Sequence, residues 1–237
     1  MNRFFACLAA LALSVCAFAV DENEVLPVGV KDFDALVVSL SAKIDYQCGV
    51  APYLELSGAT KELLEAVEVV EKDGVLSIGM KKGSSLRNIR RIHVRVGSRH
   101  ISRIDLPGAV NFRSHGNIRS NGDFSLKLTG AGEAQISDIE ADAVTLKLGG
   151  AGNLTVNSVR CKGMKSSVSG AGSLDVTGLD CAGLLEGSVN GVGGATYEGR
   201  SDDARLKLNG AGGIDVSKLD CRNVRSSING IGRIKTE

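Results

Sequence analysis

A Gly-x-Gly tripeptide recurs about every 20 residues through the second half of this chain, and it is the feature that most constrains the fold. Its six copies start 20, 20, 21, 19 and 20 residues apart. A period of this length is typical of solenoids, in which each repeat forms one turn and buries its apolar side only by stacking on its neighbours. The glycine pairs are Gly130 and Gly132, Gly150 and Gly152, Gly170 and Gly172, Gly191 and Gly193, Gly210 and Gly212, and Gly230 and Gly232.

Each repeat carries three short segments in which apolar and polar residues alternate, the pattern of strands with one buried face. In one repeat these segments are 146–148, 154–156 and 159–161, which contain Leu-Lys-Leu, Leu-Thr-Val and Val-Arg-Cys. Stacked turns bury the apolar positions against one another, and their backbone groups bond to the turns above and below. The sequence therefore predicts an all-β chain, a parallel β-helix (β-solenoid) with about 20 residues per turn.

We place the glycines at a corner of each turn, where the chain needs either a positive φ or a close approach between backbones. The central Ala, Val or Ile of each tripeptide is expected to point inward at this corner. A phosphate-binding loop is excluded because no helix is expected after any of the glycines, and such loops need one. The glycines are therefore interpreted as structural, and no cofactor is expected.

The N-terminus has the composition of a secretory signal peptide, which we assign to residues 1–19. Arg3 supplies a positive charge, an apolar run occupies residues 4–18, and residues 17–19 form the small-x-small cleavage pattern Ala-Phe-Ala. Lipoprotein processing at Cys16 is the alternative. Either route takes the mature chain out of the cytoplasm.

The rest of the chain is expected to form one domain. Residues 20–30 are assigned to an N-terminal extension and residues 31–237 to a single β-helix. Strand-like alternation lacks a clean period over residues 31–122 and becomes regular over residues 123–237, and residues 60–66 indicate a short helical turn. No segment after the signal peptide is apolar enough to predict a transmembrane span.

The charge balance and the lack of catalytic motifs argue against several functions. The chain has 28 basic and 27 acidic residues, and removal of the signal peptide takes away one arginine and no acid. The mature chain is therefore neutral, which argues against binding to nucleic acid or to anionic membranes. His93, His100 and His115 lie on separate segments without ligand spacing, and no nucleophile motif is present. We therefore assign no catalytic, cofactor-binding or metal-binding residue.

Three cysteines, Cys161, Cys181 and Cys221, occupy the same position of successive repeats. Stacking places the Cα atoms of Cys161 and Cys181 about 4.8 Å apart, which lies within the range of a disulfide. However, side chains of in-register neighbours point in parallel, so their Cβ atoms stay about 1 Å too far apart for an unstrained bridge. We expect a buried thiol column, and a disulfide between the first two remains the alternative.

Two further sets of residues are expected to stack. Asn190, Asn209 and Asn229 fall in register before the glycines, which predicts a ladder of side-chain amides. Gly108 lies 22 residues before Gly130 and is interpreted as a worn copy of the repeat corner.

The fourth repeat departs from the pattern and is the candidate surface site. Ala-Thr-Tyr at 195–197 replaces the usual Leu-x-Val, and Arg200 and Asp202 fall where Leu179 and Cys181 predict apolar residues. Clustered acids are what a polysaccharide-cleaving enzyme needs, whereas a solvated polar edge is the simpler interpretation because basic residues are interspersed. The candidate residues are Asp180, Tyr197, Arg200, Asp202, Asp203 and Asp220.

The order of the segments resembles one family. Residues 32–34 (Asp-Phe-Asp) open a strand, residues 73–78 contain an Asp-Gly hairpin turn, and residues 94–96 (Val-Arg-Val) precede the serial Gly-Ala-Gly turns. Together they resemble the putative auto-transporter adhesin head GIN domain, a domain of unknown function common in Bacteroidetes envelope proteins, over residues 31–237. The resemblance implies a right-handed parallel β-helix in the periplasm, in the outer membrane or at the surface of a Gram-negative bacterium, and it supplies no catalytic residues.

We therefore expect a secreted or envelope-associated binding module, an adhesin whose ligand is a glycan or a protein, and not an enzyme. A carbohydrate-active β-helix enzyme is one alternative, and it would need a groove lined by clustered acids. The other is a structural envelope protein that self-associates through the open end of its helix.

Overall fold

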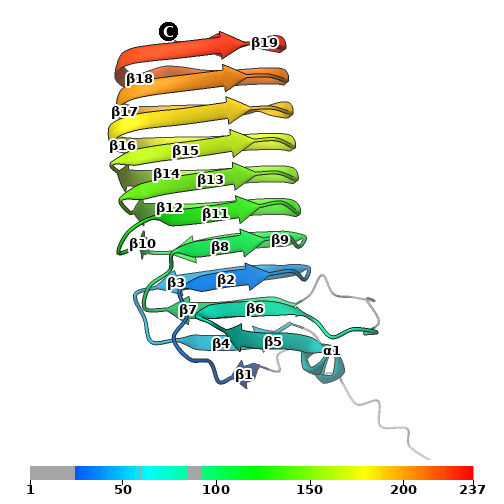
Figure 1. Cartoon of the computed structure of the whole chain (residues 1–237). Helices are drawn as coiled ribbons and strands as arrows, with labels where there is room; N and C mark the ends of the chain where they lie inside the picture. Colours follow the sequence, from blue (N-terminus) through cyan, green and yellow to red (C-terminus); the bar gives the residue numbers. More distant parts are fainter. Residues whose placement is uncertain (1–24, 59, 85–91, 237) are drawn as a thin grey trace, which may run out of the picture.

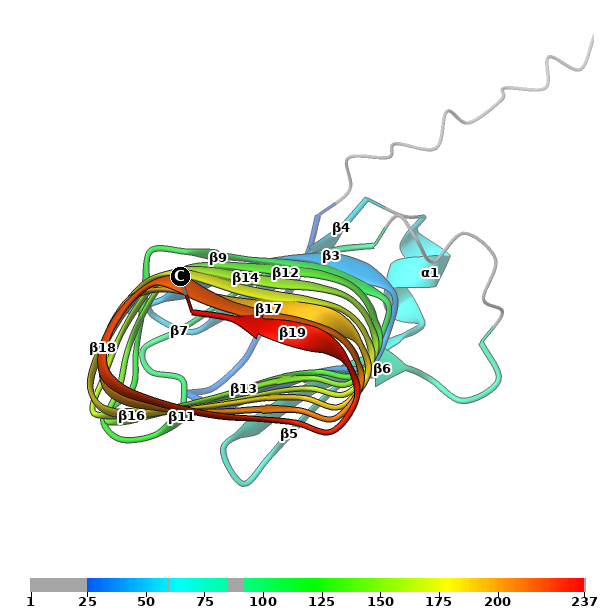
Figure 2. The ribbon, with the colours of Figure 1, turned by 90° about the horizontal axis from the view of Figure 1, so that it is seen from above.

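The computed structural model describes residues 25–58, 60–84 and 92–236. The expected signal peptide, residues 1–19, and the alternative processing site Cys16 lie outside the described residues. The chain is almost entirely β-structure and winds into a solenoid of about seven turns of about 20 residues each (Figure 1). Viewed from above in Figure 2, the chain runs counter-clockwise as it rises towards its C-terminus, so the helix is right-handed. The predicted fold class is confirmed.

Each regular turn has a long front side, a long back side and a short third side that leads from back to front (Figures 1 and 2). The front side consists of β5 (Val67–Lys72), β6 (Val75–Met80), β2 (Ala35–Val38), β8 (Arg103–Leu106), β11 (Phe124–Leu128), β13 (Ala143–Leu148), β15 (Gly163–Val168) and the final segments of β16 (Ala171–Val189), β17 (Val192–Leu208) and β18 (Ala211–Ile228). The back side consists of β1 (Leu26–Val28), β4 (Tyr53–Ser57), β7 (His93–Ser98), β3 (Ala42–Cys48), β9 (Val110–His115), the first parts of β12 (Ala131–Glu140), β14 (Ala151–Cys161), β16, β17 and β18, and β19 (Ile231–Lys235). The third side consists of β10 (Asn117–Arg119), the ends of β12 and β14 and the middle parts of β16, β17 and β18. The helix α1 (Lys61–Glu65) lies at the N-terminal end.

The core is built from like residues stacked in register. On the front side Leu126 pairs with Leu146, and on the back side Leu154 pairs with Leu174. All four side chains are fully buried. Burial of one such side chain contributes about 1.5–3 kcal/mol, so a turn gains this stabilisation only when it has neighbours on both faces.

The N-terminal third does not stack in the order of the sequence. β2 lies between β6 and β8, and β3 lies between β7 and β9 (Figure 1). Antiparallel pairs β1–β4, β4–β7 and β5–β6 close the N-terminal end, together with α1 and its buried Leu64. This arrangement explains why strand alternation in residues 31–122 has no clean period.

Several local predictions for this region are confirmed. Asp73 and Gly74, with φ angles of 51° and 74°, form the turn between β5 and β6. The short helix is α1, which begins after Thr60. Residues 26–28, assigned above to an extension, form β1 and pair with β4.

The glycines are required by close approach between turns. At each of the twelve positions, an added Cβ atom would overlap a backbone carbonyl oxygen of the turn below. For example, a Cβ at Gly150 would overlap the carbonyl oxygen of Gly130, and a Cβ at Gly172 would overlap that of Gly152. Only Gly132 and Gly152 also have φ in the left-handed region, at 130° and 153°. Gly108 lies under Gly130 in the same way and is a copy of the corner.

The central residue of each tripeptide points outward, so the predicted inward orientation is wrong. Ala131, Ala151 and Ala171 are exposed, as are Val192 and Ile231.

The uneven glycine spacings of 21 and 19 residues arise from two register shifts around β17. Leu179 of β16 pairs with Gly199 of β17, and Cys181 pairs with Ser201. The turn through β17 has one residue fewer than its neighbours before Gly199, and β16 has one residue more after Cys181. The insertion and the deletion cancel, so later turns return to register.

The buried pattern of this turn is kept. Arg200 and Asp202 are exposed, and the prediction that they align with Leu179 and Cys181 is wrong by one residue. The shorter corner needs a glycine, because a Cβ at Gly199 would overlap the carbonyl oxygen of Leu179. The buried residues of the turn are Ala195, Tyr197, Ser201, Ala204, Leu206 and Leu208.

Candidate functional site

The outer surface of the third side carries a charge ladder, a series of register partners of alternating sign. Its ion pairs join Nε of Arg119 to Oε2 of Glu140 at 3.4 Å, and Nε of Arg160 to Oδ2 of Asp180 at 3.6 Å. Nε of Arg200 donates a hydrogen bond to Oδ1 of Asp180 at 2.7 Å. The full ladder is Arg119, Glu140, Arg160, Asp180, Arg200 and Asp220.

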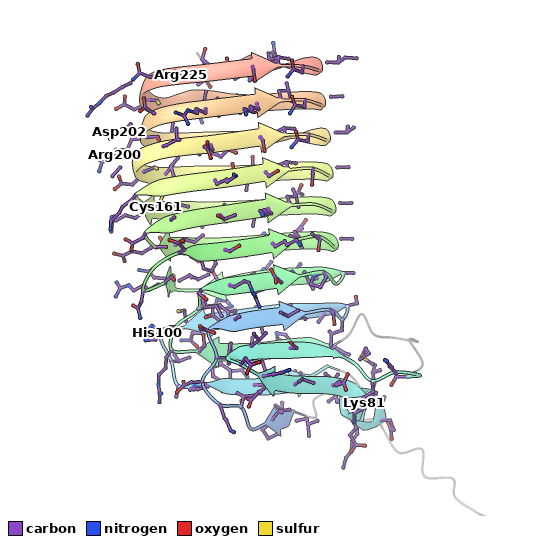
Figure 3. All side chains as sticks on the ribbon, viewed as in Figure 1. Lys81, His100, Cys161, Arg200, Asp202 and Arg225 are labelled. Carbon is purple, nitrogen blue, oxygen red and sulfur yellow. The ribbon has the colours of Figure 1, made fainter. Side chains whose placement is uncertain are left out.

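A shallow hollow of about 370 Å³, here called the corner depression, lies at the C-terminal part of this ladder. Arg200 and Asp202 project from it on the outer surface (Figure 3). Nη2 of Arg222 lies 3.7 Å from Oδ1 of Asp202, so a second ion pair flanks the ladder. The lining residues are Asp180, Cys181, Ala182, Arg200, Ser201, Asp202, Asp220 and Arg222.

The arginine next to Asp180 favours the ionised form of its carboxyl group. The hydrogen bond from the Arg200 guanidinium holds the pKa of Asp180 below its usual value. Asp180 is therefore fully ionised at neutral pH and is not a proton donor. The pairing of each acid with a nearby arginine makes the arrangement suited to polar recognition rather than to acid catalysis.

The structure brings four of the six predicted site residues together and separates the other two. Asp180, Arg200, Asp202 and Asp220 line the corner depression. Asp203 begins the front side, where Nδ2 of Asn223 donates a hydrogen bond to its Oδ1 at 2.9 Å. Tyr197 is buried and does not reach the surface.

Tyr197 fills a gap left by small residues on the opposite side of the core. Its register partner on the preceding turn is Val176, so a larger side chain enters the core here. Ser166 and Gly187 occupy inward positions of the front side, and the Tyr197 hydroxyl pairs with Oγ of Ser166. A Cβ at Gly187 would lie 3.1 Å from that hydroxyl. Burial raises the pKa of Tyr197 to about 12.

The thiol column is interrupted by a serine. Cys161 and Cys181 are register partners and are buried, and Ser201 stands between Cys181 and Cys221. Cys221 is only half-buried because no complete turn covers it. The thiols are free, and the hydrogen bond with Cys181, together with burial, raises the pKa of Cys161.

The predicted amide ladder is confirmed. Nδ2 of Asn209 donates to Oδ1 of Asn190 at 2.8 Å, and Nδ2 of Asn229 donates to Oδ1 of Asn209 at 3.1 Å. Each amide thus links two successive turns on the outside of the corner.

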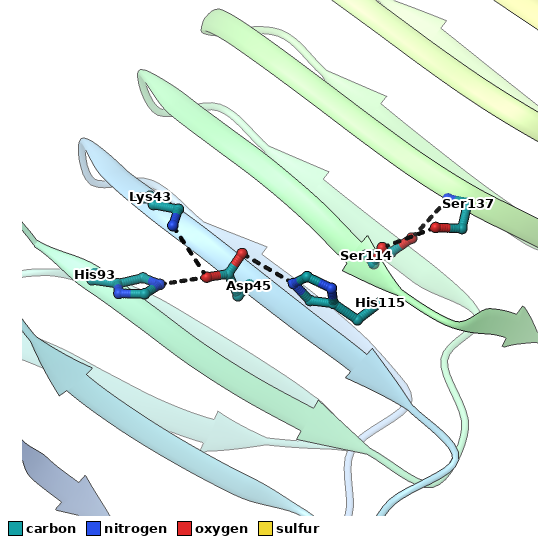
Figure 4. A network of polar contacts seen from close by, with 6 residues as sticks. All are labelled: Lys43, Asp45, His93, Ser114, His115 and Ser137. Carbon is teal, nitrogen blue, oxygen red and sulfur yellow. Dashed lines mark hydrogen bonds and ion pairs between the residues drawn. The ribbon is translucent and has the colours of Figure 1, made fainter.

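One polar cluster on the back side was missed by sequence reasoning (Figure 4). Nε2 of His93 lies 2.6 Å from Oδ2 of Asp45, and Nε2 of His115 lies 3.2 Å from Oδ1 of the same carboxylate. Nζ of Lys43 lies 3.5 Å from Oδ2. Partial burial raises the pKa of Asp45, but the hydrogen bonds from the two histidines outweigh it and bring that pKa below its usual value. The cluster holds three turns together.

No pattern in the sequence predicts this cluster, because its residues belong to β3, β7 and β9, which do not stack in the order of the sequence. In the described ranges, no group of three or more His, Cys, Asp or Glu residues is arranged to hold a metal ion. None of the helical segments in the same ranges has the length and apolar character needed to cross a membrane.

Comparison with known proteins supports the resemblance drawn from the sequence. Residues 32–185 match the profile of the family described as "Putative auto-transporter adhesin, head GIN domain". A comparison with curated proteins gave no match.

Three solved structures with the same fold come from species of Bacteroides and Parabacteroides. A putative adhesin from Bacteroides fragilis has a TM-score of 0.81 at 18% identity, covering 91% of this chain and 97% of its own. A putative adhesin from Parabacteroides distasonis has a TM-score of 0.63 at 19% identity, covering 91% and 98%. A protein from the same species, described as a putative lipid binding protein, has a TM-score of 0.67 at 15% identity, covering 92% and 98%. At these identities the likeness shows the fold alone.

Proposed function

The chain belongs to the putative auto-transporter adhesin head GIN domain family, and we propose that it is a secreted, envelope-associated module that binds a polar ligand, a glycan or a protein. In this proposal residues 1–19 are a signal peptide, the chain works outside the cytoplasm, and the ligand binds at the corner depression. The family and the neighbouring structures support an adhesin-like role.

The observation that carries the proposal is the alternation of hydrogen-bond donors and acceptors around the corner depression. The guanidinium groups of Arg200 and Arg222 only donate, and the carboxylates of Asp202 and Asp220 only accept. A sugar hydroxyl both donates and accepts hydrogen bonds, as does a peptide group through its N–H and C=O. Either ligand can therefore bond to a neighbouring arginine and carboxylate at the same time.

The ion pairs around the depression cost little to open. The side chains of Arg222 and Asp202 are 81% and 50% exposed. Exposed pairs of this kind contribute about 0–1 kcal/mol, so a ligand can replace them with hydrogen bonds of its own. No aromatic residue lines the depression to act as a stacking platform. We therefore expect weak binding at a single site, with useful strength only when several sites bind together.

A carbohydrate-cleaving enzyme is less well supported. Such enzymes need one protonated carboxyl group as a general acid, with its pKa raised. At the corner depression the nearest arginine lowers the pKa of Asp180. The acids are also paired with bases rather than facing each other across a groove.

The test is a binding screen with two matched variants. Wild-type protein, an Arg200→Gln and Arg222→Gln variant, and a Lys127→Gln and Lys147→Gln control are applied to arrays of glycans and matrix proteins. The control removes two positive charges from the front side, far from the depression. We expect a ligand that binds wild type and control and is lost by the corner variant.

A ligand that binds all three proteins equally would place the site elsewhere. Cleavage of an arrayed glycan would support the enzyme instead. Neutral lipid vesicles are included because one structural neighbour is described as a lipid binding protein. Labelling of intact cells with a reagent that does not cross membranes tests the location, since only a surface-exposed chain reacts.

A further inference from the structure

The two ends of the solenoid both carry an open strand edge, and they differ in charge. At the C-terminal end, the final segment of β18 bonds only to β17, and β19 bonds only to β18 (Figure 1). A row of backbone N–H and C=O groups is therefore left open at this edge. The inward-facing Val224 and Ile228 are partly exposed because no further turn covers them.

The C-terminal edge is basic. Residues 220–235 contain four basic residues and one acidic residue. Arg225, which Figure 3 shows near the C-terminal end, stacks on Arg205 of the turn below, so like charges are neighbours there. Among the described residues, neither Arg225 nor Arg233 lies within ion-pair distance of an acid. The basic residues are Arg222, Arg225, Arg233 and Lys235, and the acid is Asp220.

The segment formed by α1 and β5 at the N-terminal end is acidic. Residues 61–73, which contain α1 and the edge strand β5, have five acidic and two basic residues. β5 pairs only with β6, so its other edge is open as well. Glu68 and Glu71 are exposed along this strand, and the side chain of Val70 is exposed between them.

Apolar exposure is also concentrated at the ends. Six large hydrophobic residues are exposed among the described residues, by 38% to 85%, and five of them lie in the first or last strands of the stack or next to them. The sixth, Val192, lies at a glycine corner, as Ile231 does, and both point outward from the side of the stack. The five are Val25 and Val70 at the N-terminal end and Val224, Ile228 and Ile231 at the C-terminal end.

We propose that copies of this chain stack end to end, with the basic C-terminal edge of one copy on the acidic N-terminal end of the next. Opposite charges attract across this contact, the exposed apolar residues of both ends leave water, and the open strand edges offer hydrogen bonds. The two surfaces are different, so the contact is head-to-tail and repeats without closing, which produces a fibre.

The same charges disfavour other pairings of this chain. Two C-terminal edges bring arginines against arginines, and two N-terminal ends bring glutamates against glutamates. Charged edge residues usually protect a strand from aggregation, and here they block contact between like ends while leaving unlike ends compatible. The proposal does not depend on the corner depression, which lies on the side of the stack.

The test is sedimentation velocity of the purified protein over a range of concentrations, at low and high salt. One variant, Arg225→Glu with Arg233→Glu, makes the C-terminal edge acidic, and a second, Glu68→Lys with Glu71→Lys, makes the N-terminal end basic. The control is Lys127→Glu with Lys147→Glu on the exposed front side, which changes the net charge by the same amount as the first variant but away from both ends. Circular dichroism confirms that each variant is folded.

We expect wild type and control to form a concentration-dependent series of oligomers that dissociates as salt rises. Each end variant alone should weaken association by about tenfold or more. A mixture of the two end variants should associate again, because an acidic C-terminal edge then meets a basic N-terminal end. A monomer at every concentration in low salt, or a mixture that stays monomeric, overturns the proposal. Weakening by only one end variant would show that a different surface receives that end, and it overturns the proposal too.

Discussion

Two adjacent glycines of β17 offer a direct test of why the repeat corner contains glycine. A Cβ added at Gly193 would overlap the carbonyl oxygen of Gly172 in the turn below. A Cβ added at Gly194 meets nothing closer than the carbonyl oxygen of Gly213, at 3.4 Å, which is ordinary van der Waals contact. Neither residue has a φ in the left-handed region, so the two positions differ in space and not in backbone conformation.

The expected effects of Gly193→Ala and Gly194→Ala have opposite signs. At Gly193 the turns must move apart, which strains the backbone and weakens nearby bonds such as that from the N–H of Val192 to the carbonyl of Gly170, at 3.1 Å. Overpacking costs about 1–3 kcal/mol and each weakened hydrogen bond about 0.5–1.5 kcal/mol, which suggests a loss of about 3 kcal/mol. Gly194→Ala should be neutral or stabilise by about 0.5 kcal/mol, because alanine restricts the unfolded chain.

Urea unfolding followed by circular dichroism measures both free energies of unfolding under one protocol. Equal losses in the two variants would show that close approach between turns is not what selects glycine at the corner. A loss at Gly194→Ala alone would show that the register of β17 on β16 is wrong.

Three further predictions concern buried and polar groups. Tyr197→Phe should lower the free energy of unfolding by about 1 kcal/mol, measured in urea, because the buried hydrogen bond between the Tyr197 hydroxyl and Ser166 is lost. Asp45 has a lowered pKa in the folded state, so it stabilises the fold above its unfolded value near 3.8 and loses that effect as pH falls through the folded pKa. Unfolding measured against pH should therefore show that Asp45→Asn lowers stability at neutral pH, by a difference that shrinks below pH 3.8; a difference that grows in acid contradicts this. Cys161 and Cys181 should resist a water-soluble thiol reagent in the folded protein and react fully in urea, and a failure to react in urea would indicate a disulfide.

The stacked half of the fold could be predicted from the sequence because the repeats can be aligned with one another. Side chains in one column share one environment, so Leu126 over Leu146 or Asn190 beside Asn209 follows from alignment on the glycines alone. The orientation of Ala131 could not be predicted in this way. It depends on the path of the backbone through the corner, which the pattern of apolar residues does not report.

The errors at the candidate site have a similar cause. A one-residue deletion before Gly199 moves Arg200 out of the column of Leu179, and glycine spacing alone cannot tell on which side of the turn a deletion falls. Tyr197 departs from the repeat pattern because the small residue that leaves room for its ring, Gly187, belongs to another repeat. The cluster around Asp45 could not be predicted, since alignment of repeats assumes that successive repeats stack on each other.

That departure from sequence order has a consequence for how the chain folds as it is made. Residues 35–48 are the first to complete a turn, yet both edges of that turn are covered by strands that come later, the last of them ending at His115. One edge of that turn is covered only when β7 has emerged, at residue 98, and the other only when β9 has emerged, at residue 115. We expect the N-terminal third to fold in one step, with amides at Ile44 and Phe112 gaining protection together in pulse-labelled hydrogen exchange; earlier protection at Ile44 would contradict this. Every later turn can then pair with the completed strand edge of the turn before it as soon as it has been synthesised.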